Sequence, residues 1–173
     1  MTTGGFDQNQ NQPGEPSYPT PPQFDDQVAG GAFPGGAEPG SLGVRFGARL
    51  VDYILVGVVT WILLIAFGVA DNIAISGLVS GILTFAYFVV FDIRGWTPGK
   101  KMLGLSVRGP GGGNPTPQQA SIREAFNLLN IIPFIGGLLS LIAVIVIAVT
   151  INSSPTKQGK HDELAGGTQV VRG

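Results

Sequence analysis

The sequence predicts an all-α membrane protein, a small bundle of four helices preceded by a disordered tail. Nearly all of the apolar residues lie in blocks between positions 42 and 151, whereas the first forty residues are polar and rich in Gly, Pro and Gln. Membrane chains concentrate their apolar residues in this way, and soluble domains rarely do. The chain contains no cysteine, which excludes disulfides and thiolate catalysis.

Residues 1–40 form the predicted disordered tail, and residues 41–173 form the predicted membrane domain. Every charge in the tail is acidic, and the tail has no large apolar cluster. It therefore buries too little apolar surface to offset its ordering entropy. Tyr18 lies among prolines in PSYPTPPQ, a pattern typical of polyproline recognition. We favour a solvated tail over such a recognition site.

Two apolar runs predict spanning helices at about residues 42–70 and 73–91, separated by a very short turn. A helix needs about 17–25 mostly apolar residues to cross a bilayer. Small residues recur at helical spacings in the second run, where Ser76, Ser80 and Thr84 share one face. Small residues on one face predict close packing against another helix in lipid.

The third apolar block, residues 122–151, is too long for one ordinary crossing. A straight helix over it would measure about 45 Å, against a hydrocarbon core of about 30 Å. Pro133, together with Gly136 and Gly137, also disfavours an unbroken helix. We therefore expect an amphipathic or partly inserted helix over about 117–131 and an apolar helix over about 134–151.

The lysines and arginines favour four crossings with both termini in the cytoplasm, because these residues mark the cytoplasmic side. They precede the first span, follow the second and follow the last apolar helix, and the turn after the first span has none. Three crossings would place the last basic cluster outside. We therefore favour four crossings, with the third helix short or re-entrant, in the cell (inner or plasma) membrane.

The polar loop over residues 92–120 predicts a small β structure at the cytoplasmic surface. Apolar residues alternate with small or polar ones over residues 103–107, which is the period of a strand. The turn residues of PGGGNPTP favour a β-hairpin within this loop. The apolar C-terminal residues 170–171 offer a second pairing, in which the tail folds back on residues 102–108.

Arg45, Arg49 and Asp52 at the entry of the first helix form the first group of candidate site residues. Their spacing of four and three residues places all three on one helical face. A carboxylate in an apolar helix is costly unless it is paired, and an arginine lowers that cost. In a functional role Asp52 would bind a cation or a proton inside the bundle. In a structural role, slightly favoured by its place near the helix end, it would fix the depth of the helix.

Four secondary candidates lie in the loop and in the short third helix. Arg123 and Asn130 repeat the seven-residue spacing of the first group. Lys100 and Lys101 belong to GWTPGKK, whose glycine spacing departs from that of a phosphate-binding loop. We therefore expect these lysines to contact anionic lipid headgroups.

Asp162 completes the candidate cluster from the C-terminal end of the chain. It adjoins His161, the only histidine, and one His with one Asp forms neither a metal site nor a catalytic triad. Asp162 is expected either to pair with Arg45 or Arg49 or to be a solvated helix cap. The sequence predicts no enzyme, no cofactor and no metal site, and it has no basic domain for nucleic acid.

These motifs together resemble the RDD family of small membrane proteins, named for one arginine and two aspartates. The resemblance implies that Arg45 is the family arginine, with Arg49 as a rival, and that Asp52 and Asp162 are the aspartates. It also implies transport of unidentified ligands. The matching parts are residues 45–52, GWTPGKKMLGLSV at 95–107, the helix from Arg123 into Pro133, and HDELAGGTQVV at 161–171.

The expected function is transport of an unidentified ion or small ligand by a homo-oligomer or by a complex with another membrane protein. The alternative is a non-transporting membrane scaffold that recruits partners or anionic lipid. In that role its contacts would be the N-terminal tail and the basic loop. In either role the bilayer itself is a partner of the chain.

Overall fold

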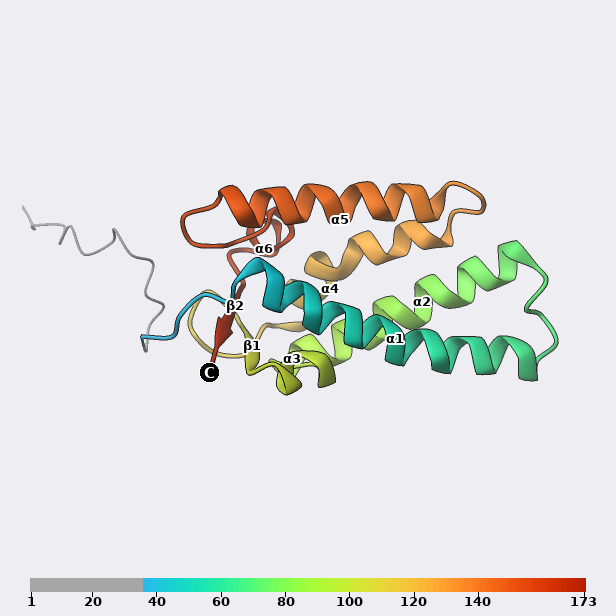
Figure 1. Ribbon diagram of the computed structural model, residues 1–173, viewed down its shortest axis with the longest axis horizontal. Helices are drawn as coiled ribbons and strands as arrows, with labels where there is room; N and C mark the ends of the chain where they lie inside the picture. Colours follow the sequence, from blue (N-terminus) through green and yellow to red (C-terminus); the bar gives the residue numbers. More distant parts are fainter. Residues whose placement is uncertain (1–35) are drawn as a thin grey trace, which may run out of the picture.

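The computed structural model describes residues 36–173 and shows a mostly helical protein with one small sheet (Figure 1). Three helices are long and apolar enough to cross a membrane. They are α1 (Leu42–Ala66), α2 (Ile73–Ile93) and α5 (Gly136–Ser153). The predicted fold class, an α-helical membrane protein, is confirmed.

Local residues set the boundary between the first two helices. α1 ends at Ala66, earlier than predicted, because Gly68 takes a φ of +66° and turns the chain. The side chain of Asn72 then accepts a hydrogen bond of 3.1 Å from the backbone N–H of Ile75 and caps α2.

The third apolar block is split as predicted. The short helix α4 (Pro117–Glu124) continues into a 3₁₀ helix, η2 (Ala125–Ile131), and α5 begins beyond Pro133. A capping box at Thr116 starts α4. Together α4 and η2 form the short third helix of the bundle.

Small residues of α2 allow close packing against η2. A Cβ built on Gly77 would lie 3.1 Å from the carbonyl oxygen of Asn130, and one on Gly81 would lie 3.1 Å from the backbone nitrogen of Ile131. No larger residue fits at these positions without a shift of the backbone. The predicted close approach therefore occurs, with η2 as the partner and with the two glycines at the contact.

The sheet joins the polar loop to the C-terminal end of the chain. β1 (Leu105–Arg108) pairs antiparallel with β2 (Gln169–Arg172), and Val107 lies opposite Val170. Of the two predicted pairings, the folded-back tail is correct and the hairpin within the loop is wrong. The physical reason is apolar burial, because β2 offers Val170 and Val171, both 2% exposed, whereas PGGGNPTP offers no apolar side chain.

The residues just before α1 also join the sheet. The backbone N–H of Gly40 donates to the carbonyl of Val170 (3.0 Å), and that of Arg172 donates to the carbonyl of Glu38 (2.8 Å). Residues 38–40 therefore belong with the membrane domain. The rest of the predicted disordered tail, with Tyr18, lies outside the described residues.

The chain runs along the bundle four times. In Figure 1 it leaves along α1, returns along α2, leaves again through α4 and η2 and returns along α5. Two short helices, α3 (Pro98–Met102) and α6 (Lys160–Leu164), lie with the sheet at the end where α1 begins. The two described ends of the chain therefore lie at the same end of the molecule.

Candidate functional site

Eight charged side chains gather at the end of the bundle where α1 begins and α2 ends. They come from five helices, and all except the partly exposed Arg49 are buried. Burying a charge is costly unless the charge is paired and hydrogen-bonded. The polar cluster consists of Arg45, Arg49, Asp52, Asp92, Lys100, Arg123, Glu124 and Asp162.

Arg123 is the centre of one network in this polar cluster. Its Nε donates to Asp162 Oδ1 (2.8 Å), and its Nη1 donates to Asp92 Oδ2 (2.7 Å). Lys100 forms an ion pair with the other oxygen of Asp92, and Arg45 Nη1 lies 3.4 Å from Asp162 Oδ2. A continuous row of ion pairs therefore links α1, α6, α4, α2 and α3. The structure thus brings Arg45 and Asp162 together.

Arg49 belongs to a second network. Its Nη1 and Nη2 donate to the two carboxylate oxygens of Glu124, at 2.9 and 2.5 Å. Glu124 also accepts from Asn127 Nδ2 (2.8 Å), and Asn127 Oδ1 accepts from the hydroxyl of Tyr53 (2.9 Å). The Arg49 guanidinium lies 3.8 Å from the centre of the Phe88 ring. This network ties Tyr53 of α1 to the start of η2.

The predicted pairing of Asp52 with an arginine is wrong. Its carboxylate accepts hydrogen bonds from the Tyr87 hydroxyl (2.8 Å), the backbone N–H of Gly99 (2.8 Å) and the Thr97 hydroxyl. These three donors, from α2 and from the start of α3, satisfy the carboxylate without a cation. Carboxylates of α4 and α6, distant in sequence, take the arginines instead.

Comparison with known protein families gives the family to which the chain belongs. The RDD family model matches residues 39–166, which is well over half of the chain. The chain belongs to the RDD family. No curated protein and no solved structure matches it. Arg45 and Asp162, which the resemblance assigns as the RDD arginine and second aspartate, form an ion pair, whereas Asp52 lies outside their network.

Three groups of the polar cluster, Asp162, Glu124 and Arg123, are stabilised in their charged forms by their neighbours. Burial acts to raise the pKa of Asp162, but Arg123, His161 and Arg45 lower that pKa to about 2. Burial likewise acts against the charged form of Glu124, yet Arg49 holds its pKa well below the usual range. For Arg123, burial is outweighed by Asp92 and Asp162, and the pKa is raised. At neutral pH these three groups are therefore charged.

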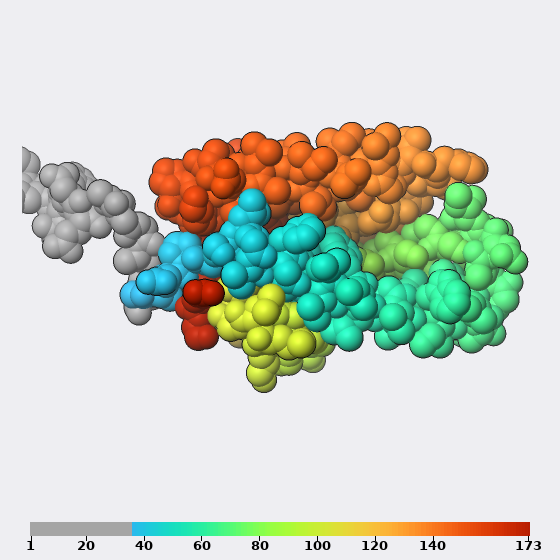
Figure 2. Space-filling view, viewed as in Figure 1, coloured from blue at the N-terminus to red at the C-terminus, as the bar shows by residue number. Residues whose placement is uncertain are grey.

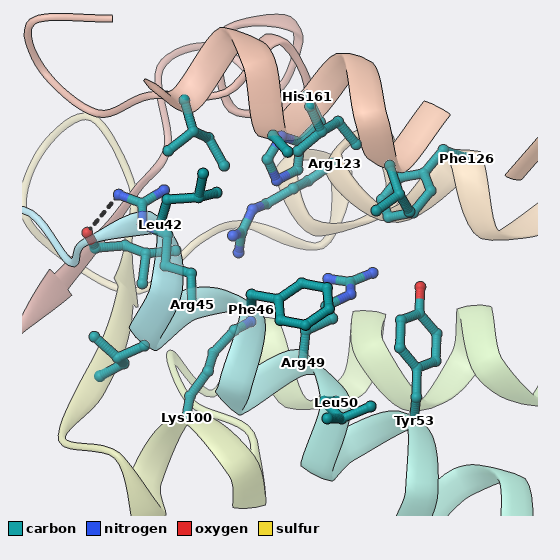
Figure 3. Close-up of a pocket in the computed structure, with 16 residues that line it drawn as sticks. Leu42, Arg45, Phe46, Arg49, Leu50, Tyr53, Lys100, Arg123, Phe126 and His161 are labelled. Carbon is teal, nitrogen blue, oxygen red and sulfur yellow. Dashed lines mark hydrogen bonds between the residues drawn. The ribbon is translucent and has the colours of Figure 1, made fainter. Parts of the chain in front are cut away.

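An inner cavity of about 240 Å³ lies beside the cluster, between α1 and α5 (Figure 3). Its charged lining consists of four bases, and no carboxylate of the polar cluster borders it. Figure 3 shows the ends of the Arg123 and Lys100 side chains directed toward each other across this space, with the Arg49 guanidinium on the side of Phe126 and Tyr53. Phe46, Leu50 and apolar residues of α5 form the side of the wall between α1 and α5.

An outer cavity of about 460 Å³ lies further along the bundle, bordered by α1, α2, α5 and the end of η2. Thr60, Ser80, Thr84 and Ser140 give it hydroxyl groups. The hydroxyls of Thr60 and Ser140 are buried and have no hydrogen-bond partner among the described residues. Tyr53, together with Val144, lines both this cavity and the inner one.

The secondary candidates divide between the cluster and its surroundings. Arg123 and Lys100 belong to the polar cluster, whereas Lys101 is exposed, with its Nζ 4.9 Å from the centre of the Trp96 ring. Asn130 lies outside the cluster; its Nδ2 donates to the carbonyl of Asn127 (3.3 Å), and it lines the outer cavity.

Sequence reasoning missed two acids of the cluster, Asp92 and Glu124. Asp92 ends an apolar run as Asp52 begins one, so the same signal was present there. Glu124 directly follows Arg123 in a helix predicted to be amphipathic, but its partner Arg49 is distant in sequence. Within residues 36–173, no group of three His, Asp or Glu side chains is arranged to hold a metal ion.

Acidification is expected to destabilise the protein through His161. Burial lowers the pKa of His161 from 6.5 to about 4, against the attraction of Asp162, whose Oδ1 lies 3.7 Å from His161 Nε2. Between these pH values the unfolded chain binds a proton that the folded protein does not bind. The free energy of unfolding therefore falls by about 1.4 kcal/mol per unit as pH drops from 6.5 to 4.

Unfolding by SDS in mixed micelles, followed at pH 7, 6, 5 and 4.5, measures this slope. The His161→Gln variant carries no titrating group at this position, so its slope over the same range should be much smaller. An equal slope in the two proteins would show that His161 is not the group responsible. Asp162 does not affect this slope, because its contribution to the free energy of unfolding is lost only as pH falls from about 4, its pKa in the unfolded chain, toward 2, its pKa in the folded protein.

Proposed function

We propose that this RDD protein transports a small anionic ligand across the membrane. The observation that carries the proposal is the pair of cavities that meet at Tyr53, one beside the buried bases and one lined by hydroxyls. The ligand occupies the inner cavity at one stage of transport and the outer cavity at another. Tyr53 and Val144 form the barrier between the two stages.

The charge of the inner cavity supports an anion rather than a cation. The four bases of the lining face the space, and the carboxylates that pair with them lie behind the lining. Asp52, which in its functional role would bind a cation or a proton, borders neither cavity, and its oxygens already accept three hydrogen bonds. An anion enters a positive potential here without displacing a carboxylate.

The second network couples ligand binding to the barrier. An anion at Arg49 competes with Glu124 for the guanidinium, and Glu124 is hydrogen-bonded to the same Asn127 that holds the Tyr53 hydroxyl. Loosening the pair of Arg49 with Glu124 therefore loosens Tyr53. The ligand itself then favours the conformation in which the barrier opens.

The basic end of the molecule faces the cytoplasm in this proposal, and the membrane is the cell membrane. The basic residues, the sheet and both described ends of the chain gather at one end, in agreement with the positive-inside rule. A bundle this small offers little depth for a path, so the transporter works as a homo-oligomer or with another membrane protein. It requires neither catalysis nor a cofactor.

Substitution of Ser140 by leucine is expected to abolish uptake, because the added side chain fills the outer cavity. Purified protein in liposomes is assayed for uptake of labelled acetate, phosphate and chloride. We expect at least a tenfold loss for one of these anions. Ser153→Leu serves as the matched control, since this serine is exposed at the end of the same helix and lines neither cavity.

Uptake of none of the three anions by the unmodified protein would argue against transport and in favour of the scaffold role. That role depends on residues 1–40 and on the basic loop, where Lys101 is exposed. Deletion of residues 1–35, which leaves the backbone pairing of residues 38–40 with the sheet intact, followed by a pull-down from membranes tests it directly. Uptake unaffected by Ser140→Leu would retain transport but reject the outer cavity as its path.

A further inference from the structure

We infer that the inner cavity binds an anionic phospholipid from the adjoining leaflet, with the phosphate among the bases and one acyl chain between α1 and α5. This inference goes beyond the proposed function, because the lipid is a bound component of the cavity and not the small anion that is transported. The site itself depends only on the geometry of the cavity.

The cavity opens sideways, toward the lipid. Its walls between the bases and the membrane are Phe46 and Leu50 on α1 and Val144 and Ile147 on α5. Phe46 is 61% and Leu50 50% exposed, and both helices are candidate spans, so this rim faces hydrocarbon. In Figure 2, α1 and α5 lie side by side along one face of the molecule. A lipid can enter here without crossing water.

The bases retain donors for a phosphate. Arg123 uses its Nε and Nη1 for carboxylates, and no group among the described residues accepts from its Nη2. Lys100 has one hydrogen-bond acceptor, Asp92, for the three donors of its ammonium group. Both residues line the cavity, so a phosphate oxygen at this place meets N–H groups that are not already occupied.

Charge complementarity favours an anionic headgroup over a zwitterionic one. The polar cluster contains four bases and four carboxylates, but the bases line the cavity and none of the carboxylates does, so the potential inside the cavity is positive. The phosphate of phosphatidylglycerol is complementary to these bases. Phosphatidylcholine brings a further cation that finds no carboxylate in the lining, and free phosphate leaves the apolar rim uncovered.

Native mass spectrometry of the delipidated, full-length protein in detergent tests the inference. The protein is titrated with phosphatidylglycerol and phosphatidylcholine of identical acyl chains, and separately with glycerol 3-phosphate. We expect one phosphatidylglycerol per chain, bound at least tenfold more tightly than phosphatidylcholine, and no binding of glycerol 3-phosphate at the same concentration. Equal affinity for the two lipids, or binding of glycerol 3-phosphate alone, would overturn the inference.

Two variants locate the lipid without touching the ion pairs. Ala148→Phe fills the cavity from α5 and is expected to lower the affinity for phosphatidylglycerol at least tenfold. Val149→Phe, on the next residue, points away from the cavity, where valine is 60% exposed, and should leave the affinity unchanged. Similar affinities for both variants and the unmodified protein would place the lipid elsewhere and reject the site. If Ala148→Phe does not fold, the comparison of the two lipids on the unmodified protein still decides.

The results separate the inference from the proposed function. Specific phosphatidylglycerol binding without uptake of any anion into liposomes would support the lipid site and reject transport. Uptake of small anions that depends on Ser140, without specific lipid binding, would support transport and reject the lipid. Each outcome therefore bears on one of the two claims.

Discussion

Replacing Arg123 with glutamine is expected to destabilise the protein more than any other single change in the polar cluster. Arg123 contacts Asp92 and Asp162 at once, and both carboxylates are fully buried. Removing one partner of a buried ion pair costs about 3–5 kcal/mol, because it leaves an uncompensated buried charge. Here two carboxylates lose a partner, although Lys100 remains beside Asp92 and Arg45 beside Asp162. We therefore expect a loss at or above the upper end of this range.

Unfolding by SDS in mixed micelles at pH 7 measures the loss. Arg94→Gln is the matched control, because Arg94 is exposed at the end of α2 and makes no ion pair with a described residue. The control should change the free energy of unfolding by less than about 0.5 kcal/mol. A loss below about 1 kcal/mol for Arg123→Gln would mean that water or a shifted lysine replaces the guanidinium, so that neither carboxylate is left uncompensated.

The sequence was sufficient for those parts of the fold that depend on local hydrophobicity. Two spans, the break at Pro133 and the strand at residues 105–108 all follow from periodicity, length and helix-breaking residues. The pairing of that strand with the C-terminal end could be proposed because Val170 and Val171 are the apolar part of the tail. For the two spans, the break and the strand itself, the physical cause lies within a few residues of the feature, and only the pairing with the C-terminal end joins distant residues.

The ion pairs of the site could not be predicted in the same way, because their partners are far apart in the chain. Helical spacing placed Asp52 on the face of Arg45 and Arg49, and it suggested a local pair. The folded chain instead supplies Glu124 to Arg49, and it surrounds Asp52 with a hydroxyl and an N–H from the start of α3. A local spacing shows which residues share a face. It does not show which distant element packs on that face.

The pair of Arg49 and Glu124 leads to the second large effect, which is asymmetric. Arg49→Leu is expected to cost about 3–5 kcal/mol, because it leaves the fully buried Glu124 carboxylate with Asn127 as its remaining side-chain donor. Glu124→Leu should cost less. The freed Arg49 guanidinium still lies over the rings of Phe88, Phe126 and Tyr53, and its side chain is 18% exposed.

The double variant Arg49→Leu/Glu124→Leu distinguishes the net contribution of the ion pair to the free energy of unfolding from the loss caused by removing only one partner. Two leucines replace the charges beside the Phe88 ring, and a buried ion pair replaced by apolar groups is often close to neutral in stability. The double variant should therefore be more stable than Arg49→Leu, and a double-mutant cycle in SDS should give a coupling of about 2–3 kcal/mol. Additive losses would mean that the two side chains stabilise the bundle independently.

The same double variant is also expected to let anions pass more readily between the inner and the outer cavity. Asn127 loses the Glu124 side chain that orients it, and it therefore holds the Tyr53 hydroxyl less firmly.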